Sequence, residues 1–267
     1  MSTRVAVLGA TGRMGRTVVR ALAERADLRL VGALASPTSS MVGRDAGENA
    51  GAPSLGVAIQ SDRNAVLERA DVAIDFSLPA AVAANVAACV ERRCPMVVGT
   101  TGLSDEAMNG LRAASRTIPL LYSPNMSIGV NLMFRIAELA AGILGDDYDA
   151  EILDIHHRNK IDAPSGTALR LGEAVARARG VDFRSHAVLA RQGAAGPRDK
   201  GQIGFSAQRG GDNPGEHSLT FAGPGETLTV SHAAGDRLCF ARGALRAAQW
   251  LTTRPPGLYS MTDVFGL

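Results

Sequence analysis

The chain has 267 residues, of which 46% are hydrophobic and 20% charged, with 28 lysines and arginines against 26 aspartates and glutamates. A chain of this length and apolar content buries a large core, so the composition excludes an intrinsically disordered protein. The formal net charge of +2 is too small to predict a polyanionic partner, and we expect no nucleic-acid binding.

Cysteine usage and the lengths of the apolar runs indicate the compartment. The three cysteines, Cys89, Cys94 and Cys239, are odd in number and form no CxxC pair, which predicts reduced thiols in the cytoplasm. Gly9 interrupts the first apolar run too soon for a secretory signal peptide. No apolar run approaches the roughly 20 residues that a membrane-spanning helix needs, so we expect no membrane partner.

The first 125 residues alternate short apolar runs with amphipathic stretches. The expected strands are Arg4–Leu8, Leu28–Leu34, Val72–Phe76, Met96–Val98 and Pro119–Tyr122. The expected helices are Arg13–Arg25, Pro79–Arg92 and Ser104–Arg116. Strands with almost no internal polar residue, joined by helices, are typical of a parallel sheet that is covered on both faces. The pattern predicts an α/β fold with a Rossmann-type, doubly wound parallel sheet.

The alternation of expected strands and helices ends at about residue 126. Two helices are expected at Ile128–Leu144 and Ser165–Arg179, with a strand at Ala150–His156 between them. Strand-like runs without a long helix between them follow at Ala187–Arg191, Gln202–Gln208, His217–Ala222 and Thr227–His232, with a polar, flexible loop at Gly193–Gly201. These runs predict a second, α+β domain with a mixed sheet. The last helical pattern, Arg237–Leu251, is expected to pack back on the first domain.

A glycine-rich loop joins the first strand to the first helix. It reads Gly9-Ala10-Thr11-Gly12-Arg13-Met14-Gly15. In the dinucleotide fingerprint the first glycine allows the sharp turn, the second lets the backbone approach a pyrophosphate, and the third lets helix and strand pack closely. The helix N-terminus favours phosphate, and Arg13 adds a cation. An ordinary glycine turn is the alternative, because the spacing is GxxGxxG rather than GxGxxG.

The second strand leaves the choice between NADH and NADPH open. An acidic residue about 20 residues after the glycines would bind the adenine ribose, but Ala35 and Ser36 stand at this position. No carboxylate there repels a 2′-phosphate, and the nearest arginine is Arg44. The pattern leans weakly towards NADPH.

Further loops follow the carboxyl ends of strands, where α/β folds bind ligands. They contain Phe76-Ser77, Gly99-Thr100-Thr101-Gly102 and Ser123-Pro124-Asn125-Met126-Ser127. Their backbone and hydroxyl donors suit a nicotinamide carboxamide. Each of them taken alone also fits an ordinary turn.

The segment from Asp154 to Ala168 is the most informative in the chain. Two of the five histidines, His156 and His157, lie within five residues of Lys160. Histidine exchanges a proton near neutral pH, whereas a lysine with a pKa of about 10.4 stays protonated and donates one. Ser165, Gly166 and Thr167 form the start of a helix, which favours an anion. Cations beside such a helix end suit a small carboxylate-bearing ligand.

Three other interpretations of this segment compete. A charge run is often a solvated face. Phosphate or nucleic-acid binding lacks aromatic partners. Asp154 and His156 have metal-ligand spacing, but no further ligand is evident, so we expect no metal.

Taken together, the motifs resemble the dihydrodipicolinate reductase (4-hydroxy-tetrahydrodipicolinate reductase) family of lysine biosynthesis. The residues that carry the resemblance are the glycine loop, Gly99-Thr100-Thr101-Gly102, Ser123-Pro124-Asn125-Met126-Ser127 and the segment HHRNKIDAPSGTA that starts at His156. It covers essentially the whole chain, including Gly215-Glu216-His217. It implies a dinucleotide domain at residues 1–127, completed by 237–267, and a substrate and oligomerisation domain at 128–236. It also implies a homotetramer.

The resemblance assigns roles by position. Cofactor-binding positions are Gly9, Ala10, Thr11, Gly12, Arg13, Met14, Ser36, Gly99, Thr100, Thr101, Ser123, Pro124, Asn125 and Met126. His156 corresponds to a proton donor and acceptor and Lys160 to a proton donor, while His157, Gly166 and Thr167 correspond to positions that bind a dicarboxylate. The implied reaction is hydride transfer from NADPH or NADH to ring carbon C4, followed by protonation as the domains close. The family's acid–arginine pair is absent at Ala35 and Ser36.

Two rival functions remain. A non-catalytic NAD(P)H sensor has no reason to retain His156 and Lys160 beside a helix start. Other reductases need motifs that are missing: Tyr122 and Tyr148 lack the lysine four residues on that short-chain enzymes use, and Cys89 and Cys94 lack a catalytic partner nearby.

Overall fold

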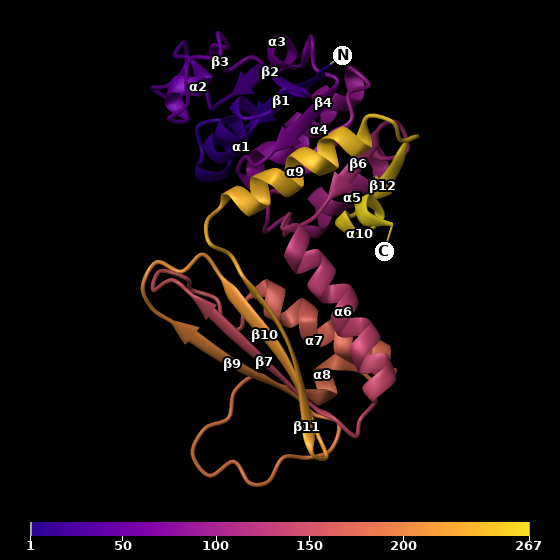
Figure 1. The fold of residues 1–267 in the computed structure, drawn as a ribbon. Coiled ribbons are helices and arrows are strands. Elements are labelled where there is room, and N and C mark those ends of the chain that lie inside the picture. Colours follow the sequence, from indigo (N-terminus) through magenta and orange to yellow (C-terminus); the bar gives the residue numbers. More distant parts are fainter. Residues whose placement is uncertain (1, 267) are drawn as a thin grey trace. The chain divides into compact units, whose positions relative to one another are not determined.

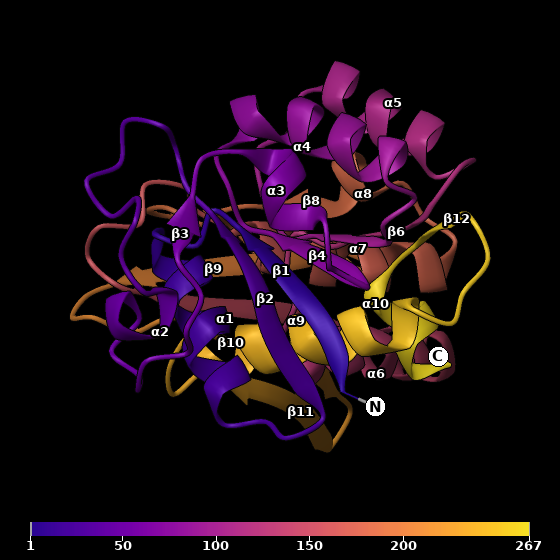
Figure 2. The same cartoon turned by 90° about the horizontal axis from the view of Figure 1, so that it is seen from above.

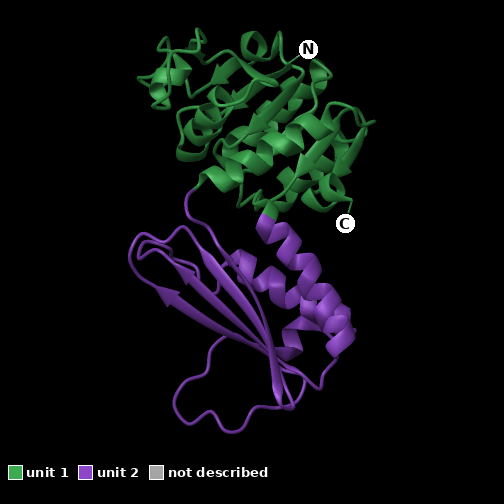
Figure 3. Ribbon diagram, in the orientation of Figure 1, with its two compact units in different colours: residues 1–128, 237–267 green, residues 129–236 purple. Residues whose placement is uncertain are grey.

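The structure, a computed structural model, describes residues 2–266. The chain divides into two compact units, residues 1–128 with 237–267 (unit 1) and residues 129–236 (unit 2) (Figure 3). Each unit is built around a sheet of its own. None of the described helices combines the length and hydropathy that crossing a lipid bilayer requires.

Unit 1 contains a parallel sheet of seven strands in the order β12-β6-β5-β4-β1-β2-β3. The strands are β1 (Thr3–Leu8), β2 (Leu28–Leu34), β3 (Ile59–Gln60), β4 (Val72–Asp75), β5 (Met96–Val98), β6 (Pro119–Tyr122) and β12 (Gly257–Tyr259). After β1 the chain builds outward through β2 and β3, then returns to the other side of β1 with β4. The carboxyl ends of β1 and β4 therefore form the switch point at which such sheets bind ligands.

Helices cover both faces of this sheet (Figure 2). They are α1 (Arg13–Ala23), α2 (Ala46–Asn49), α3 (Arg63–Leu67), α4 (Pro79–Glu91), α5 (Asp105–Ala114), α9 (Leu238–Leu251) and α10 (Met261–Phe265). The helices α1 and α9 share one apolar core with alternate residues of β1, including Val5 and Val7. The helices α4 and α5 share the other core, with Ala6 and Leu8. Because successive side chains of a strand point to opposite faces, the uninterrupted apolar run of β1 serves both layers.

Unit 2 contains a mixed sheet of five strands in the order β11-β10-β7-β9-β8. The strands are β7 (Asp149–His156), β8 (Ala187–Val188), β9 (Ile203–Arg209), β10 (Glu216–Gly223) and β11 (Glu226–Ala233). Central β7 pairs antiparallel with β10 and parallel with β9. The helices α6 (Ile128–Leu144), α7 (Gly166–Arg179) and α8 (Phe183–His186) lie on one face of the sheet (Figure 1).

The two kinds of sheet confirm the expected fold class, with differences in the short elements. The sequence analysis missed α2, β3, α3, α8, β12 and α10, each of five residues or fewer. The strand expected at Ala187–Arg191 ends at Val188, because only Ala187 and Val188 pair with β9. The Arg191 guanidinium beyond it forms two hydrogen bonds with Glu151. The loop expected at Gly193–Gly201 is anchored by Arg198, which donates to the carboxylates of Asp149 and Glu151.

Candidate active site

The glycine loop connects β1 to α1, and each of its glycines has a different structural reason. Gly9 has φ +80°, and a Cβ there would lie 2.8 Å from the carbonyl oxygen of Phe76. A Cβ on Gly15 would lie 2.1 Å from the carbonyl oxygen of Gly9, so helix and loop touch at this point. Gly12 is exposed and has ordinary backbone angles, with φ −72°. Gly9 and Gly15 are thus required by packing, whereas Gly12 leaves space on the outside of the loop.

The N-terminus of α1 is prepared for an anion. Gly12 is its N-cap and offers no side chain, and the first turn contains no acidic residue. The first N–H groups of a helix carry partial positive charge and need an acceptor, which a phosphate supplies. Thr11 is half-buried, Arg13 is exposed, and Ala10 and Met14 pack against the core beneath. The residues fit a dinucleotide pyrophosphate.

The end of β2 lies beside this loop, because Leu34 pairs with Leu8 and accepts hydrogen bonds from the N–H groups of Gly9 and Ala10. Ala35 is buried, and Ser36 is exposed with its Oγ 2.9 Å from Thr38 Oγ1. The carboxylate that follows, Asp45, accepts from three backbone N–H groups as the cap of α2. The turn therefore offers hydroxyls to a ribose or its phosphate, and either NADH or NADPH fits.

A buried carboxylate, Asp75, holds the next two loops together. It ends β4, is fully buried, and accepts from the N–H of Ser77 at 2.7 Å and from Nδ2 of Asn85 at 2.9 Å. Burial raises the pKa of Asp75, although Ser77 and Asn85 donate to it. Thr100, after β5, donates to the carbonyl oxygen of Ser77 at 3.1 Å. Sequence reasoning missed Asp75; an acidic residue that ends an apolar strand was the available signal.

The remaining positions of unit 1 follow β5 and β6. A Cβ on Gly99 would lie 2.2 Å from the ring of Phe76, so the β4 and β5 loops are in close contact. Thr101 is exposed beyond it. After β6, Ser123 Oγ donates to the carbonyl oxygen of Asn125 and fixes the turn, with Pro124 exposed and Met126 buried. All predicted cofactor positions therefore lie at the carboxyl edge of one parallel sheet.

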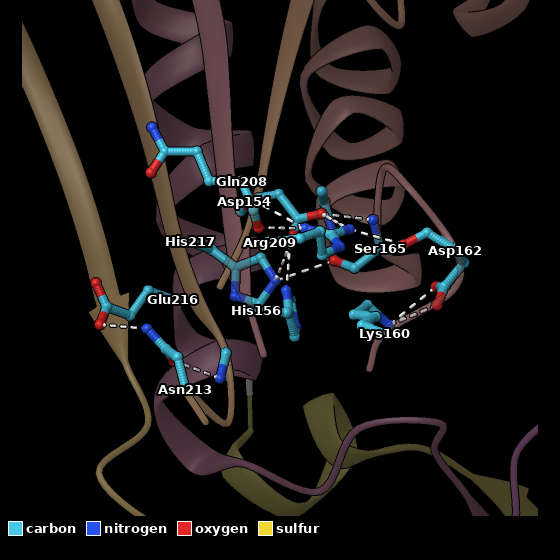
Figure 4. Close-up of polar contacts among 12 residues, drawn as sticks. Asp154, His156, Lys160, Asp162, Ser165, Gln208, Arg209, Asn213, Glu216 and His217 are labelled. Carbon is cyan, nitrogen blue, oxygen red and sulfur yellow. Dashed lines mark hydrogen bonds and ion pairs between the residues drawn. The ribbon is translucent and has the colours of Figure 1, made fainter. Parts of the chain in front are cut away.

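In unit 2 the predicted proton donor lies at the end of β7. Alternate residues of β7 are buried, so Asp154 and His156 continue the row of Ala150 and Ile152 on the helix-covered face. The register places His217 of β10 directly opposite Asp154. The His156 and His217 rings meet edge to face, with centroids 5.2 Å apart. The apolar core of the unit thus ends in a buried polar cluster, which Figure 4 shows.

Asp154 is the centre of this cluster. Its Oδ1 lies 2.7 Å from Nδ1 of His156, and its Oδ2 accepts from the Ser165 N–H at 2.7 Å and from Arg209 at 3.0 Å. Burial alone would raise the pKa of Asp154, but His156, the Ser165 amide and Arg209 outweigh burial and hold the pKa below its ordinary value. Burial lowers the pKa of His217 to about 4, against the attraction of Asp154. Near neutral pH the cluster therefore contains an ionised Asp154 and a neutral His217.

The loop after β7 carries Lys160, whose ammonium group lies 2.8 Å and 3.0 Å from the two carboxylate oxygens of Asp162. Figure 4 shows Lys160 turned towards Asp162. His157 is half-buried, and its N–H donates to the carbonyl oxygen of Asn213. His156 and His157 thus have different surroundings, as the alternation along a strand predicts.

Helix α7 begins where the sequence predicts, with Ser165 as its N-cap. The Ser165 N–H donates to the carboxylate of Asp154 at 2.7 Å. Gly166 is exposed and Thr167 half-buried in the first turn. Both follow directly after Ser165, which contacts Asp154 and His217 in the polar cluster.

The sequence did not predict the residues that contact Asp154. Sequence reasoning considered Asp154 only as a metal ligand and found no third one, but the structure places His217 with Asp154 and His156, all three ligand atoms within 4.8 Å of one another. Arg209, whose guanidinium lies on the same carboxylate, was not singled out. A charged residue inside the apolar run Ile152–Ile155 was the available signal for a partnered carboxylate.

The doubly wound sheet, with a glycine loop at its switch point, is typical of dinucleotide-binding proteins, and unit 2 adds a buried cluster of side chains able to exchange protons. Two family descriptions match it: "Dihydrodipicolinate reductase, N-terminus" over residues 3–126 and "Dihydrodipicolinate reductase, C-terminus" over residues 129–265. The chain belongs to the dihydrodipicolinate reductase family.

Curated relatives agree over the full length. The chain is 49% identical to the 4-hydroxy-tetrahydrodipicolinate reductases of Alkalilimnicola ehrlichii and Thiobacillus denitrificans, each over 267 residues and 100% of both chains. Among solved structures it is similar to a dipicolinate-bound dihydrodipicolinate reductase from Paenisporosarcina sp. TG-14, with a TM-score of 0.78 and 24% identity, covering 98% of this chain and 99% of that one. This likeness confirms the fold.

Proposed function

We propose that the protein reduces 4-hydroxy-tetrahydrodipicolinate to tetrahydrodipicolinate, with NADPH or NADH, in the diaminopimelate route to lysine. The observation that carries the proposal is full-length identity of 49% to reductases of that name, joined to an acid–base cluster at the predicted positions. The site residues, the division of labour between the units and the oligomeric state form part of the same proposal.

Unit 1 would hold the cofactor. The N-terminus of α1 and the Gly9–Met14 loop suit the pyrophosphate, and Ser36 the adenine ribose. The loops at Gly99–Thr101 and Ser123–Met126 suit the nicotinamide. When bound, the reduced nicotinamide supplies a hydride.

Unit 2 would bind the dicarboxylate and supply the proton. His157 and the first turn of α7, with Gly166 and Thr167, face the substrate's carboxylates in this proposal. Hydride addition at C4 leaves an enamine that must gain a proton, and His156 and Lys160 are the groups able to donate one. The positive charge of Lys160 also stabilises negative charge that develops on the substrate.

A coupled assay tests the function. The upstream synthase generates the substrate from pyruvate and aspartate semialdehyde, and loss of the reduced-nicotinamide absorbance is followed with NADPH and with NADH in parallel. We expect substrate-dependent oxidation, with NADPH accepted at least as well as NADH because Asp45 is occupied as a helix cap. Binding of dinucleotide without oxidation of either would contradict the proposal and favour a sensor.

A homotetramer is proposed through the helix-free face of the unit 2 sheet. This face carries hydroxyl pairs across β10 and β11, Ser218 with Ser231 and Thr220 with Thr229, beside half-buried Leu153. The small, neutral side chains of these hydroxyl pairs suit contact with a second copy of the same sheet. Light scattering should give four times the chain mass of 27.7 kDa. Thr220→Arg should yield smaller species; an unchanged mass in that variant would place the contact elsewhere.

A cytoplasmic location completes the proposal. Its support is the chemistry of the cysteines, because no disulfide joins Cys89, Cys94 or Cys239 within the described part of the chain. Free thiols persist in a reducing compartment.

A further inference from the structure

We infer that Asp154 is a positioning residue, which fixes the protonated nitrogen of His156 so that the proton is exchanged at Nε2. The inference rests on the proposed role of His156 as proton donor. It concerns a residue to which the sequence motifs assign no part in the reaction. Its basis is the arrangement of donors around one buried carboxylate.

The first step is the contact between the two side chains. Oδ1 of Asp154 lies 2.7 Å from Nδ1 of His156 but 3.5 Å from Nε2 of His217. Nε2 of His217 is closer to Ser165 Oγ, at 3.1 Å. His156 is therefore the histidine that Asp154 orients, while Ser165 orients His217.

The second step follows from the charge of Asp154. The side chain is 1% exposed, and its contacts hold its pKa below the ordinary value, so it is an ionised carboxylate that only accepts hydrogen bonds. Nδ1 and Oδ1 do not meet at hydrogen-bond angles, but a lone pair on Nδ1 would face this negative charge at 2.7 Å, so we place the ring proton on Nδ1. Nδ1 of His156 is protonated in both charge states of the ring, and Nε2 is the atom that gains and loses a proton.

Nε2 of His156 lies next to the backbone of Gly215. A Cβ on Gly215 would lie 2.8 Å from Nε2 of His156, and this glycine has φ +145°. No side chain from this position therefore covers Nε2. When His156 protonates the substrate, the N–H bond at Nε2 breaks, its electron pair stays on the nitrogen, and the proton forms a new bond on the substrate. The ring is left neutral with Nδ1–H still facing Asp154.

The variant Asp154→Asn distinguishes a role in orienting His156 from a role in stabilising the fold. In the variant the Oδ2 site still faces two donors, the Ser165 N–H and Arg209, so the amide oxygen takes that place. The amide NH2 then faces Nδ1 of His156. Because a donor there requires a lone pair on Nδ1, the proton moves to Nε2. The shape of the cluster is kept and its tautomer is reversed.

The test combines kinetics with ¹⁵N NMR of the full-length protein labelled at its five histidines. His156→Gln identifies the His156 resonances. In the wild type we expect Nδ1 protonated; in Asp154→Asn we expect protonated Nε2 and a kcat lower by at least about 100-fold, with KM and the Kd for NADPH unchanged. Asp199→Asn, a loop aspartate outside the cluster, is the matched control and should resemble the wild type.

Two results would overturn the inference: a wild-type His156 with its proton on Nε2, or an Asp154→Asn enzyme with wild-type kcat. A purely structural role would lower the stability of the variant without reversing the protonated nitrogen. If Asp154→Asn does not fold, the wild-type spectrum still decides the question. The resonances do not depend on turnover, so failure of the substrate assay would overturn the proposed function and leave this result separate.

Discussion

Lys160→Ala should lower kcat by at least about 100-fold while leaving the Kd for NADPH unchanged. Lys160 carries a positive charge beside Asp162 and stands on the same loop as His157, in the unit that would bind the substrate. Alanine removes both a proton donor and a charge that favours a negatively charged substrate. Steady-state kinetics with the coupled assay and fluorescence titration with NADPH measure the two quantities separately.

Lys200→Ala is the matched control for this variant. Lys200 lies in the same unit and pairs with Asp147 at 2.9 Å, but its side chain is 64% exposed, against 20% for Lys160. The carboxylate partners, Asp162 and Asp147, are 55% and 75% exposed, and an ion pair with an exposed partner contributes about 0 to 1 kcal/mol, so both variants should remain folded. Wild-type turnover in Lys160→Ala would remove this lysine from the reaction.

Gly15→Ala should destabilise the protein by about 3 kcal/mol or more and abolish dinucleotide binding. The added methyl group would lie 2.1 Å from the carbonyl oxygen of Gly9, and both atoms belong to backbone-fixed positions. Relief requires α1 to move away from β1, which opens the loop on which the pyrophosphate site depends. Chemical denaturation and NADPH titration measure the two effects.

Gly12→Ala and Gly110→Ala are the control variants for Gly15→Ala. The Gly12 methyl group would lie 3.3 Å from the Gly9 carbonyl oxygen, so the fold should persist while the cofactor Kd rises about tenfold, or about 1.4 kcal/mol. Gly110 is inside α5 with open space around it, and alanine there should stabilise the helix by up to about 1 kcal/mol. A Gly15→Ala protein as stable as Gly110→Ala would contradict the prediction, because it would show that α1 moves away from β1 without a loss of folding free energy.

The first domain was predictable because its signals are local. One short stretch contains the apolar run Val5–Leu8, the glycines after it and the amphipathic pattern of α1. Together these three signals indicate a strand, a turn and a helix. The two-residue strand β3 was not predictable, because Ile59 and Gln60 form a strand only by pairing with Ala33 and Leu34. Tertiary pairing, rather than propensity, makes such an element.

The candidate site was predictable in part for the same reason. His156, Lys160 and Ser165 belong to one continuous segment, and its helix start is visible in the sequence. The partners of Asp154 are not: His217 and Arg209 come from other strands, and only the register of β7 with β10 and β9 brings them to it. The register of a mixed sheet depends on packing that one sequence does not reveal.

One carboxylate connects the end of a strand to the start of a helix. Oδ1 of Asp154 contacts His156 at the end of β7, and Oδ2 accepts from the N–H of Ser165, the N-cap of α7. Loss of this one carboxylate would therefore release the His156 ring and leave the N–H of the α7 N-cap without its acceptor at the same time.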